Sequence, residues 1–202
     1  MKKLILAALA TALLPASALA QDAGTIGGAF VGGQIGWGKR SVDLDYGLLG
    51  VDDFDKSRNG IEYGVFAGYD YGVGSNMIVG VEAGIGMGGK TLRDTPVAGL
   101  TAEVDPKWNY DVSARAGFLA TPNLLVYGRL GYGAERTRVS TVSTLQGVAS
   151  TSEKGWSDGL LYGGGLEYGL NESASIRTEY RHRDMDGGYA ADQVLAGLAF
   201  RF

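Results

Sequence analysis

Apolar and polar residues alternate along most of the chain, and the alternation is clear at its end. Val194, Leu198 and Phe202 lie in one row, whereas Gln193 and Arg201 lie in the other. A period of two residues is typical of a β-strand whose two faces meet different surroundings. This period predicts eight strands, near residues 28–39, 61–73, 77–88, 108–121, 124–137, 157–170, 174–184 and 192–202.

The connections between these strands alternate in length. Three short ones, Gly74–Asn76, Thr121–Asn123 and Asn171–Ser173, consist of residues that favour tight turns. Longer polar connections are predicted near residues 40–60, 89–107, 138–156 and 185–191. An even number of strands joined alternately by short and long connections predicts an all-β fold: an eight-stranded antiparallel up-and-down transmembrane β-barrel.

The two faces of the predicted strands favour a membrane barrel. In the third strand, Val79, Val81 and Ile85 alternate with Gly80 and Glu82. All eight apolar rows are expected to be free of Asp, Glu, Lys and Arg, because a lipid-facing Lys or Arg near the midplane costs about 2–4 kcal/mol. The polar rows are rich in the chain's 34 glycines, which suits a narrow lumen crowded with side chains. The alternative, a soluble β-sandwich, is disfavoured because glycine weakens an exposed strand.

The polar rows also carry full charges, which a barrel would turn into its lumen. They comprise seven acidic residues and five arginines: Glu62, Asp70, Glu82, Asp111, Glu135, Glu167, Glu179, Arg115, Arg129, Arg177, Arg181 and Arg201. These side chains are expected to pair, because an isolated buried charge is very costly. We predict an ion-pair network that plugs the lumen, formed by Glu82, Arg115, Arg129, Glu167, Arg177 and Glu179. The alternative is a gated or narrow path for ions along the same charges.

The start of the chain has a different pattern. The letters MKK, the apolar run LILAALATALL and a final ALA indicate a secretory signal peptide over residues 1–20. The predicted β-barrel domain then covers residues 21–202. The chain has a net charge of −4 and no cysteine. Nucleic acid is therefore not expected as a partner, and the exported fold is expected to hold together without disulfides.

Four stretches carry a resemblance to a known family. They are FVGGQIGWG (Phe30–Gly38), LLVYGRLGYG (Leu124–Gly133), EYRHRDMDGG (Glu179–Gly188) and the ending GLAFRF. The chain resembles the small outer-membrane β-barrel family, the OmpX/OmpA-type barrels and porin-like surface antigens of Gram-negative bacteria. The resemblance implies that the last strand signals to the outer-membrane assembly machinery through Gly197, Phe200 and Phe202. This chain departs from the family at Leu195, where a polar residue is usual.

Two further features invite a chemical interpretation. His182 is the only histidine, and its parity places it on the lipid side with Tyr180 and Asp184. No serine shares that face of the strand, so we expect an interfacial histidine rather than a catalytic one. The acidic segment around Asp53 and Asp55 is expected to be a solvated loop, with loose binding of divalent cations as the alternative. No enzyme activity, catalytic residue, metal site or cofactor is predicted.

These observations predict a structural protein of the bacterial outer membrane, with a lumen plugged by charges and with surface-exposed loops. We expect a monomer in contact with outer-membrane lipid and lipopolysaccharide. Two alternatives stay open: a narrow porin-like channel for small solutes or ions, and an adhesin or host-interaction surface protein. The adhesin hypothesis rests on the acidic first loop and on the Ser/Thr-rich third loop near residues 138–155.

Overall fold

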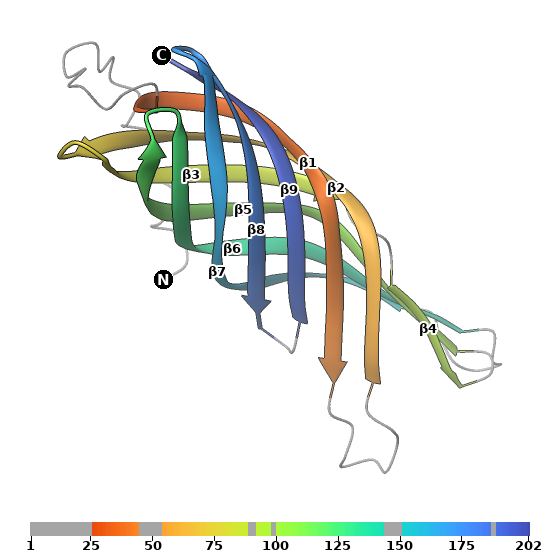
Figure 1. Ribbon diagram of the computed structural model, residues 1–202. Coiled ribbons are helices and arrows are strands. Elements are labelled where there is room, and N and C mark those ends of the chain that lie inside the picture. The colour runs from red at the N-terminus through yellow and green to blue at the C-terminus, as the bar shows by residue number, and fades with distance from the viewer. Residues whose placement is uncertain (1–25, 45–53, 89–91, 98–99, 144–150, 187–188) are drawn as a thin grey trace, which may run out of the picture.

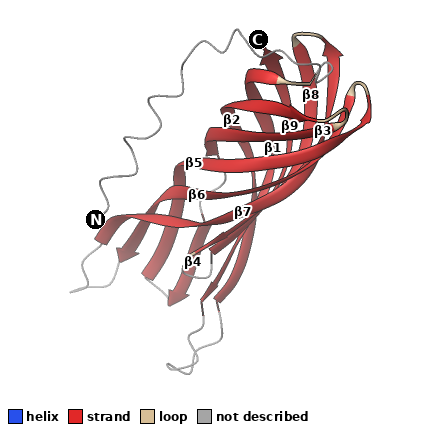
Figure 2. Cartoon of the chain, turned by 90° about the vertical axis from the view of Figure 1, so that its left-hand side faces the viewer, coloured by secondary structure: helices blue, strands red, loops and turns tan. Residues whose placement is uncertain are grey.

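The computed structural model describes residues 26–44, 54–88, 92–97, 100–143, 151–186 and 189–202. Within these ranges every regular element is a strand (Figures 1 and 2). The strands are β1 (Gly28–Leu44), β2 (Phe54–Val73), β3 (Met77–Gly88), β4 (Leu92–Val97), β5 (Leu100–Thr121), β6 (Leu124–Ser143), β7 (Thr151–Asn171), β8 (Ala174–Met185) and β9 (Tyr189–Arg201). None of the described residues forms a helix long and apolar enough to cross a membrane.

Eight of these strands form a closed antiparallel barrel, which confirms the predicted fold. Neighbours in the chain pair with each other, β3 pairs with β5 across the β4 excursion, and β1 pairs with β9. The seam between β1 and β9 runs from Phe30 opposite Arg201 to Val42 opposite Tyr189. The apolar run at the end of the chain is therefore the strand that closes the barrel and leaves no unpaired edge facing lipid.

The two ends of the barrel differ. The end that we call the turn rim carries the tight turns at residues 74–76, 121–123 and 171–173, together with the start of β1 and the end of β9. The opposite end, the loop rim, carries the longer connections. In Figure 1 the turn rim lies toward the upper left and the loop rim toward the lower right.

The predicted distribution of side chains between the two faces is confirmed. Val81 and Leu198 point outward and are 59% and 51% exposed, whereas Glu82 and Arg129 point into the lumen and are 2% and 5% exposed. A soluble sandwich would show the reverse, with the apolar rows in a dry centre. The outward apolar rows instead form a continuous belt around the barrel, as hydrocarbon requires.

Inward glycines make room for the large side chains of the lumen. A Cβ atom at Gly32 would overlap the ring of Phe66, and a Cβ atom at Gly165 would lie 2.9 Å from the hydroxyl oxygen of Tyr127. Because eight strands enclose a lumen just wide enough for side chains to fill, a large residue on one strand requires a small one opposite. The abundance of glycine on the polar rows is therefore a packing requirement.

Several strands extend further toward the loop rim than predicted. Pairing of β1 with β2 continues to Leu44 opposite Phe54, and pairing of β6 with β7 continues to Thr141 opposite Thr151. The loops expected near residues 40–60 and 138–156 are thus largely strand. The loop expected at 89–107 contains β4, which pairs with the outer part of β5. The alternation of apolar and polar residues did not reveal these extensions. A hairpin beyond the apolar belt has no face in contact with lipid, so nothing requires its residues to alternate.

Candidate functional site

The lumen is filled with charged side chains. Among the described residues, seven carboxylates and seven arginines are buried: Glu62, Asp70, Glu82, Asp111, Glu135, Glu167, Glu179, Arg40, Arg115, Arg129, Arg177, Arg181, Arg183 and Arg201. Their formal charges cancel. Sequence reasoning missed Arg40, because it was assigned to a loop. It also missed Arg183, although this residue continues the inward row of Arg177 and Arg181.

Four of these residues form a closed ring near the turn rim, which we call the turn-rim ring: Asp70, Arg115, Glu167 and Arg201. They come from β2, β5, β7 and β9, which are every second strand of the barrel. Arg115 contacts Asp70 at 2.5 Å and Glu167 at 3.0 Å. Arg201 contacts the same two carboxylates at 3.0 and 2.5 Å. Charges of alternating sign thus follow one another around the full circumference.

A second layer, the central layer, uses the four strands that the ring leaves out. It consists of Gln34, Glu82, Arg129 and Arg177, from β1, β3, β6 and β8. The Glu82 carboxylate accepts hydrogen bonds from Arg177 at 2.6 Å and from Arg129 at 3.0 Å. Arg177 also donates to the Gln34 amide oxygen at 2.9 Å. Arg129 reaches Glu179 at 2.9 Å. The pair between Arg177 and Glu82 joins opposite walls of the barrel.

The six residues predicted to form the network lie in one connected group. Arg115 lies 3.0 Å from Glu167 and 3.6 Å from Glu82, and therefore joins the turn-rim ring to the central layer. Glu82 then contacts both Arg129 and Arg177. The structure adds Asp70, Asp111, Arg181 and Arg201 from the wider inward set, together with Arg183.

Aromatic rings support the guanidinium groups of both layers. The Arg115 guanidinium lies over the rings of Phe30 and Tyr127, at 4.7 and 4.9 Å from their centroids. The Arg177 guanidinium lies 3.4 Å from the centroid of Phe66. Such contacts stabilise a desolvated cation on the faces that carry no hydrogen-bond partner.

An apolar cluster lies inside the barrel at the turn rim. Ile26, Ile78, Leu125 and Tyr127 are buried against one another, and Leu119 packs against them. Tyr127 also donates a hydrogen bond to Glu179 at 2.7 Å. This side chain therefore links the apolar cluster to the charged side chains of the lumen.

Pairing is less complete toward the loop rim. Three arginines share the carboxylate of Asp111: Arg129 at 3.0 Å, Arg181 at 3.4 Å and Arg183 at 3.0 Å. The Nε and Nη1 atoms of Arg183 have no hydrogen-bond partner among the described residues, although the residue is only 2% exposed. Arg183 lines a small cavity of about 10 Å³, which is room for about one water.

A smaller charged group adjoins this cavity through Glu62 and Gln193. Arg40 contacts Glu62 at 2.7 Å and, on the opposite wall, Glu135 at 3.3 Å. Tyr189 donates to Glu135 at 2.9 Å, and Gln193 donates to Glu62. This group has one arginine for two carboxylates, so its surplus negative charge faces the surplus of arginines around Asp111.

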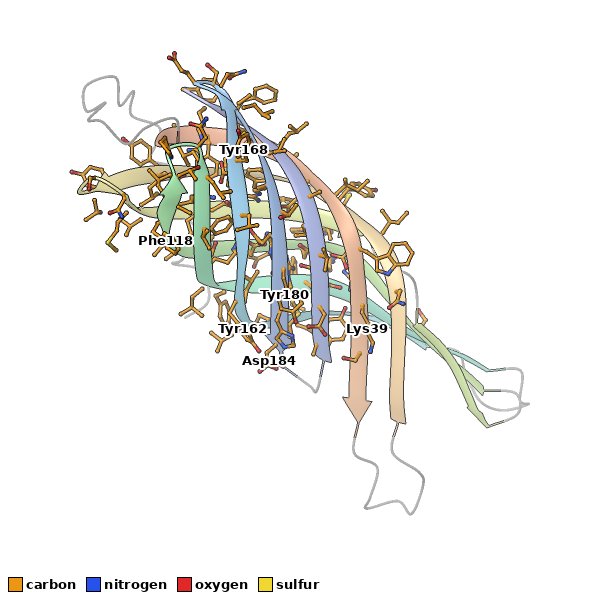
Figure 3. The ribbon with its side chains drawn as sticks, in the orientation of Figure 1. Lys39, Phe118, Tyr162, Tyr168, Tyr180 and Asp184 are labelled. Atoms are coloured by element: carbon orange, nitrogen blue, oxygen red, sulfur yellow. The ribbon has the colours of Figure 1, made fainter. Side chains whose placement is uncertain are left out.

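The expectation that all outward rows are free of charge is wrong at the loop rim. Lys39, Asp158, Asp184 and Asp192 continue the outward rows of β1, β7, β8 and β9 beyond their apolar parts. Figure 3 shows Lys39 and Asp184 at this end of the barrel. The reason is physical: the penalty for a charge falls toward the membrane interface, so the rows need to be apolar only within the hydrocarbon layer.

His182 lies on the outward face, as its parity predicts. Its Nδ1 atom is 2.8 Å from Asp192, which also accepts a hydrogen bond from the Tyr180 hydroxyl at 2.6 Å. The Tyr162 ring lies beside the imidazole, with a centroid distance of 5.0 Å. Sequence reasoning placed Asp184 beside this histidine but missed Asp192, which belongs to the neighbouring strand.

The remaining predicted residues lie at the turn rim or outside the described set. Phe200 and Phe202 point outward and are 57% and 85% exposed, whereas Gly197 faces the lumen, where a Cβ atom would lie 3.3 Å from the Arg177 side chain. The acidic segment around Asp53 and Asp55 lies where side chains are not described. No group of His, Cys, Asp or Glu side chains suited to a metal ion occurs among the residues that the structure describes.

Comparisons with known proteins agree with this architecture. Residues 6–202 match the model of the outer membrane protein beta-barrel domain. The 31 kDa outer-membrane immunogenic protein of Brucella melitensis is 27% identical over 170 residues, which cover 79% of this chain and 68% of that protein.

Two solved structures share the fold at low sequence identity. The attachment invasion locus protein Ail of Yersinia pestis is 19% identical, with a TM-score of 0.50 over 88% of this chain and 100% of that chain. Neisserial surface protein A is 17% identical, with a TM-score of 0.51 over 86% and 97%.

Proposed function

Because the chain belongs to the outer membrane protein beta-barrel domain family, we propose that it is a plugged structural barrel of the bacterial outer membrane. Its family members are outer-membrane proteins and not enzymes, and the chain is located in that membrane. In this family the short turns face the periplasm and the longer loops face outward. The turn rim is then periplasmic and the loop rim extracellular. The barrel serves as a rigid base for the hairpins that project from the loop rim.

The turn-rim ring is the observation that carries this proposal. A lumen that conducts ions needs a path through every cross-section, and this ring occupies one cross-section from wall to wall. Each of its four members contacts two others at 2.5–3.0 Å. The apolar cluster of Ile26, Ile78 and Leu125 lies on its periplasmic side. Opening a path would leave buried charges unpaired, which typically costs about 3–5 kcal/mol for each broken pair.

Conductance of the purified, refolded protein in planar bilayers tests the proposal. We expect no steady conductance from the unaltered chain, and none from a Val81→Ala control on the outer face. Heat-dependent gel mobility establishes that both proteins are folded. A steady conductance of the unaltered protein that responds to Arg129→Ala would contradict the proposal and favour a narrow channel.

A second candidate function is a contact surface for other cells. It is supported by the paired backbone of β1 and β2, which continues to Leu44 opposite Phe54, well beyond Trp37 and Ile61 in the apolar belt. An ordered hairpin presents its tip with less loss of entropy on binding than a free loop. Replacing residues 45–53 and 144–150 with Asn-Gly turns should then abolish cell attachment while the barrel still folds. Unchanged attachment would eliminate this candidate.

We also infer that Gly197, Phe200 and Phe202 act as the signal for the assembly machinery. The exposure of Phe202 at the periplasmic end supports this role, because a receptor could reach it there. Phe202→Ala should lower the amount of protein in the outer membrane of cells but leave refolding in detergent unchanged. Equal loss in both experiments would indicate a purely structural role.

A further inference from the structure

The outward apolar rows differ in length around the barrel. On β2, seven successive outward positions from Val73 to Ile61 are uncharged, and six are uncharged on β3, from Met77 to Met87. On β8 only four outward positions run from Ala174 to Tyr180, after which His182 and Asp184 follow.

The apolar rows of β9, which pairs with β8, and of β1, which pairs with β9, are also short. On β9 five outward positions run from Phe202 to Val194 before Asp192, and on β1 five run from Ala29 to Trp37 before Lys39. The short rows therefore lie side by side on β8, β9 and β1, whereas the long rows of β2 and β3 follow directly after β1.

These lengths translate into different heights of the apolar belt. Two residues advance about 6.7 Å along a strand, and a strand tilted by about 40° gains about 5 Å of height for each outward position. The belt is then about 30–35 Å tall on β2 and β3, but about 20–25 Å tall on β8, β9 and β1. The usual apolar band of such barrels is about 25 Å tall.

Polar side chains occupy the space that a taller belt would fill. Asp192 lies opposite Lys39 in the β1–β9 ladder and accepts hydrogen bonds from Tyr180 and His182. We call Lys39, His182, Asp184 and Asp192 the loop-rim patch. Figure 3 shows Lys39, Tyr180 and Asp184 together at this end, far from Tyr168 near the turn rim. Hydrocarbon around the loop-rim patch would strip water from one cation and two carboxylates.

Tilting the barrel cannot remove this mismatch. When the barrel tilts, the turn-rim border and the loop-rim border of the apolar belt move together on each side. The belt therefore stays shorter over β8, β9 and β1 than over β2 and β3. A bilayer can instead adapt its thickness locally, at a cost of fractions of a kcal/mol per Å. We propose that the outer leaflet is thinned over β8, β9 and β1, and that lipid headgroups descend there to contact the loop-rim patch.

The headgroups suit the chemistry of the patch. Phosphate oxygens accept hydrogen bonds and carry negative charge, which matches Lys39, and headgroup water solvates Asp184 and Asp192. Hydrogen bonds from Tyr180 and His182 hold Asp192 at the wall. The partner of this surface is therefore the headgroup layer of the outer leaflet rather than a protein.

Depth measurements with spin labels test the proposal, and the absence of cysteine makes single labels simple to place. Val194→Cys and Val65→Cys put a label at the fifth outward position on β9 and on β2, counted from the turn rim. In vesicles of dimyristoylphosphatidylcholine, we expect the β9 label to collide several-fold more often with a water-soluble nickel chelate, relative to oxygen, than the β2 label does. Equal collision ratios at the two positions would overturn the proposal.

A second variant tests whether the loop-rim patch sets the depth to which the lipid headgroups descend beside β9. His182→Leu combined with Asp192→Leu lengthens the short rows, and should bury the β9 label more deeply while leaving the β2 label unchanged. An unchanged β9 label in this folded variant would also overturn the proposal. If the variant fails to fold, the comparison of labels in the otherwise unaltered chain still decides the outcome.

Discussion

The periplasmic and extracellular halves of the lumen solve the same electrostatic problem differently. In the periplasmic half, four charges from alternate strands alternate in sign, and each contacts two others. In the extracellular half, three arginines compete for Asp111, and Arg183 leaves two donors unpaired beside a cavity. From this difference we predict that stability depends more on how completely the buried charges are paired than on how many are buried.

The largest effect is expected from Arg115→Ala, which opens the turn-rim ring. It leaves Asp70 and Glu167 with one arginine instead of two and removes the cation over the rings of Phe30 and Tyr127. We expect a loss of about 3–5 kcal/mol in the free energy of unfolding, as for other buried pairs that lose one partner. Equilibrium urea unfolding in detergent or lipid vesicles, followed by tryptophan fluorescence, measures it. A loss no greater than that of Arg183→Met would show that the turn-rim ring contributes no more to the free energy of unfolding than the arginines around Asp111 do.

An intermediate effect is expected from Gly165→Val, which overfills the lumen beside Tyr127. The new side chain would collide with the Tyr127 hydroxyl, whose hydrogen bond to Glu179 would shift. Overpacking of this kind costs about 1–3 kcal/mol. The same urea measurement applies, with the outward Gly128→Ala as the control, because a Cβ atom there meets no atom closer than 3.8 Å. Equal stability of the two variants would refute the packing role of inward glycines.

The smallest effect is expected from Arg183→Met in the extracellular half. Asp111 keeps Arg129 at 3.0 Å and Arg181 at 3.4 Å, and two unpaired donors disappear from the lumen. The loss of free energy should stay below about 1 kcal/mol, because a buried donor without a partner is itself a cost. A loss comparable to that of Arg115→Ala would mean that Arg183 has partners, such as bound water, that its protein contacts do not reveal.

Much of this architecture could be predicted from the sequence because the bilayer imposes a strict rule. Each strand that crosses it must present an apolar row, so the alternation located the membrane-crossing parts of all eight barrel strands. It also predicted that Glu82 and Arg129 face the lumen. The rule stops at the edge of the hydrocarbon. Beyond it, Arg40 was assigned to a loop, β4 was missed, and the outward charges Lys39 and Asp192 were not expected.

The partners of each charge were also beyond the sequence. Arg177 on β8 meets Glu82 on β3, on the opposite wall of the barrel. Such contacts depend on the stagger of the strands, which no local pattern records. The sequence therefore indicated which residues share the lumen, whereas the ring that they form emerged only from the closed barrel.

The seam between β1 and β9 has a consequence for the order in which the protein matures. Phe30 pairs with Arg201, and the Phe202 amide donates to the Ala29 carbonyl oxygen at 3.0 Å. β1 can therefore pair on its second edge only after β9 has joined the sheet. Until then the outer edge of β1 is unpaired and the outward apolar rows lack their lipid surroundings. Such an incomplete sheet is prone to aggregate in water.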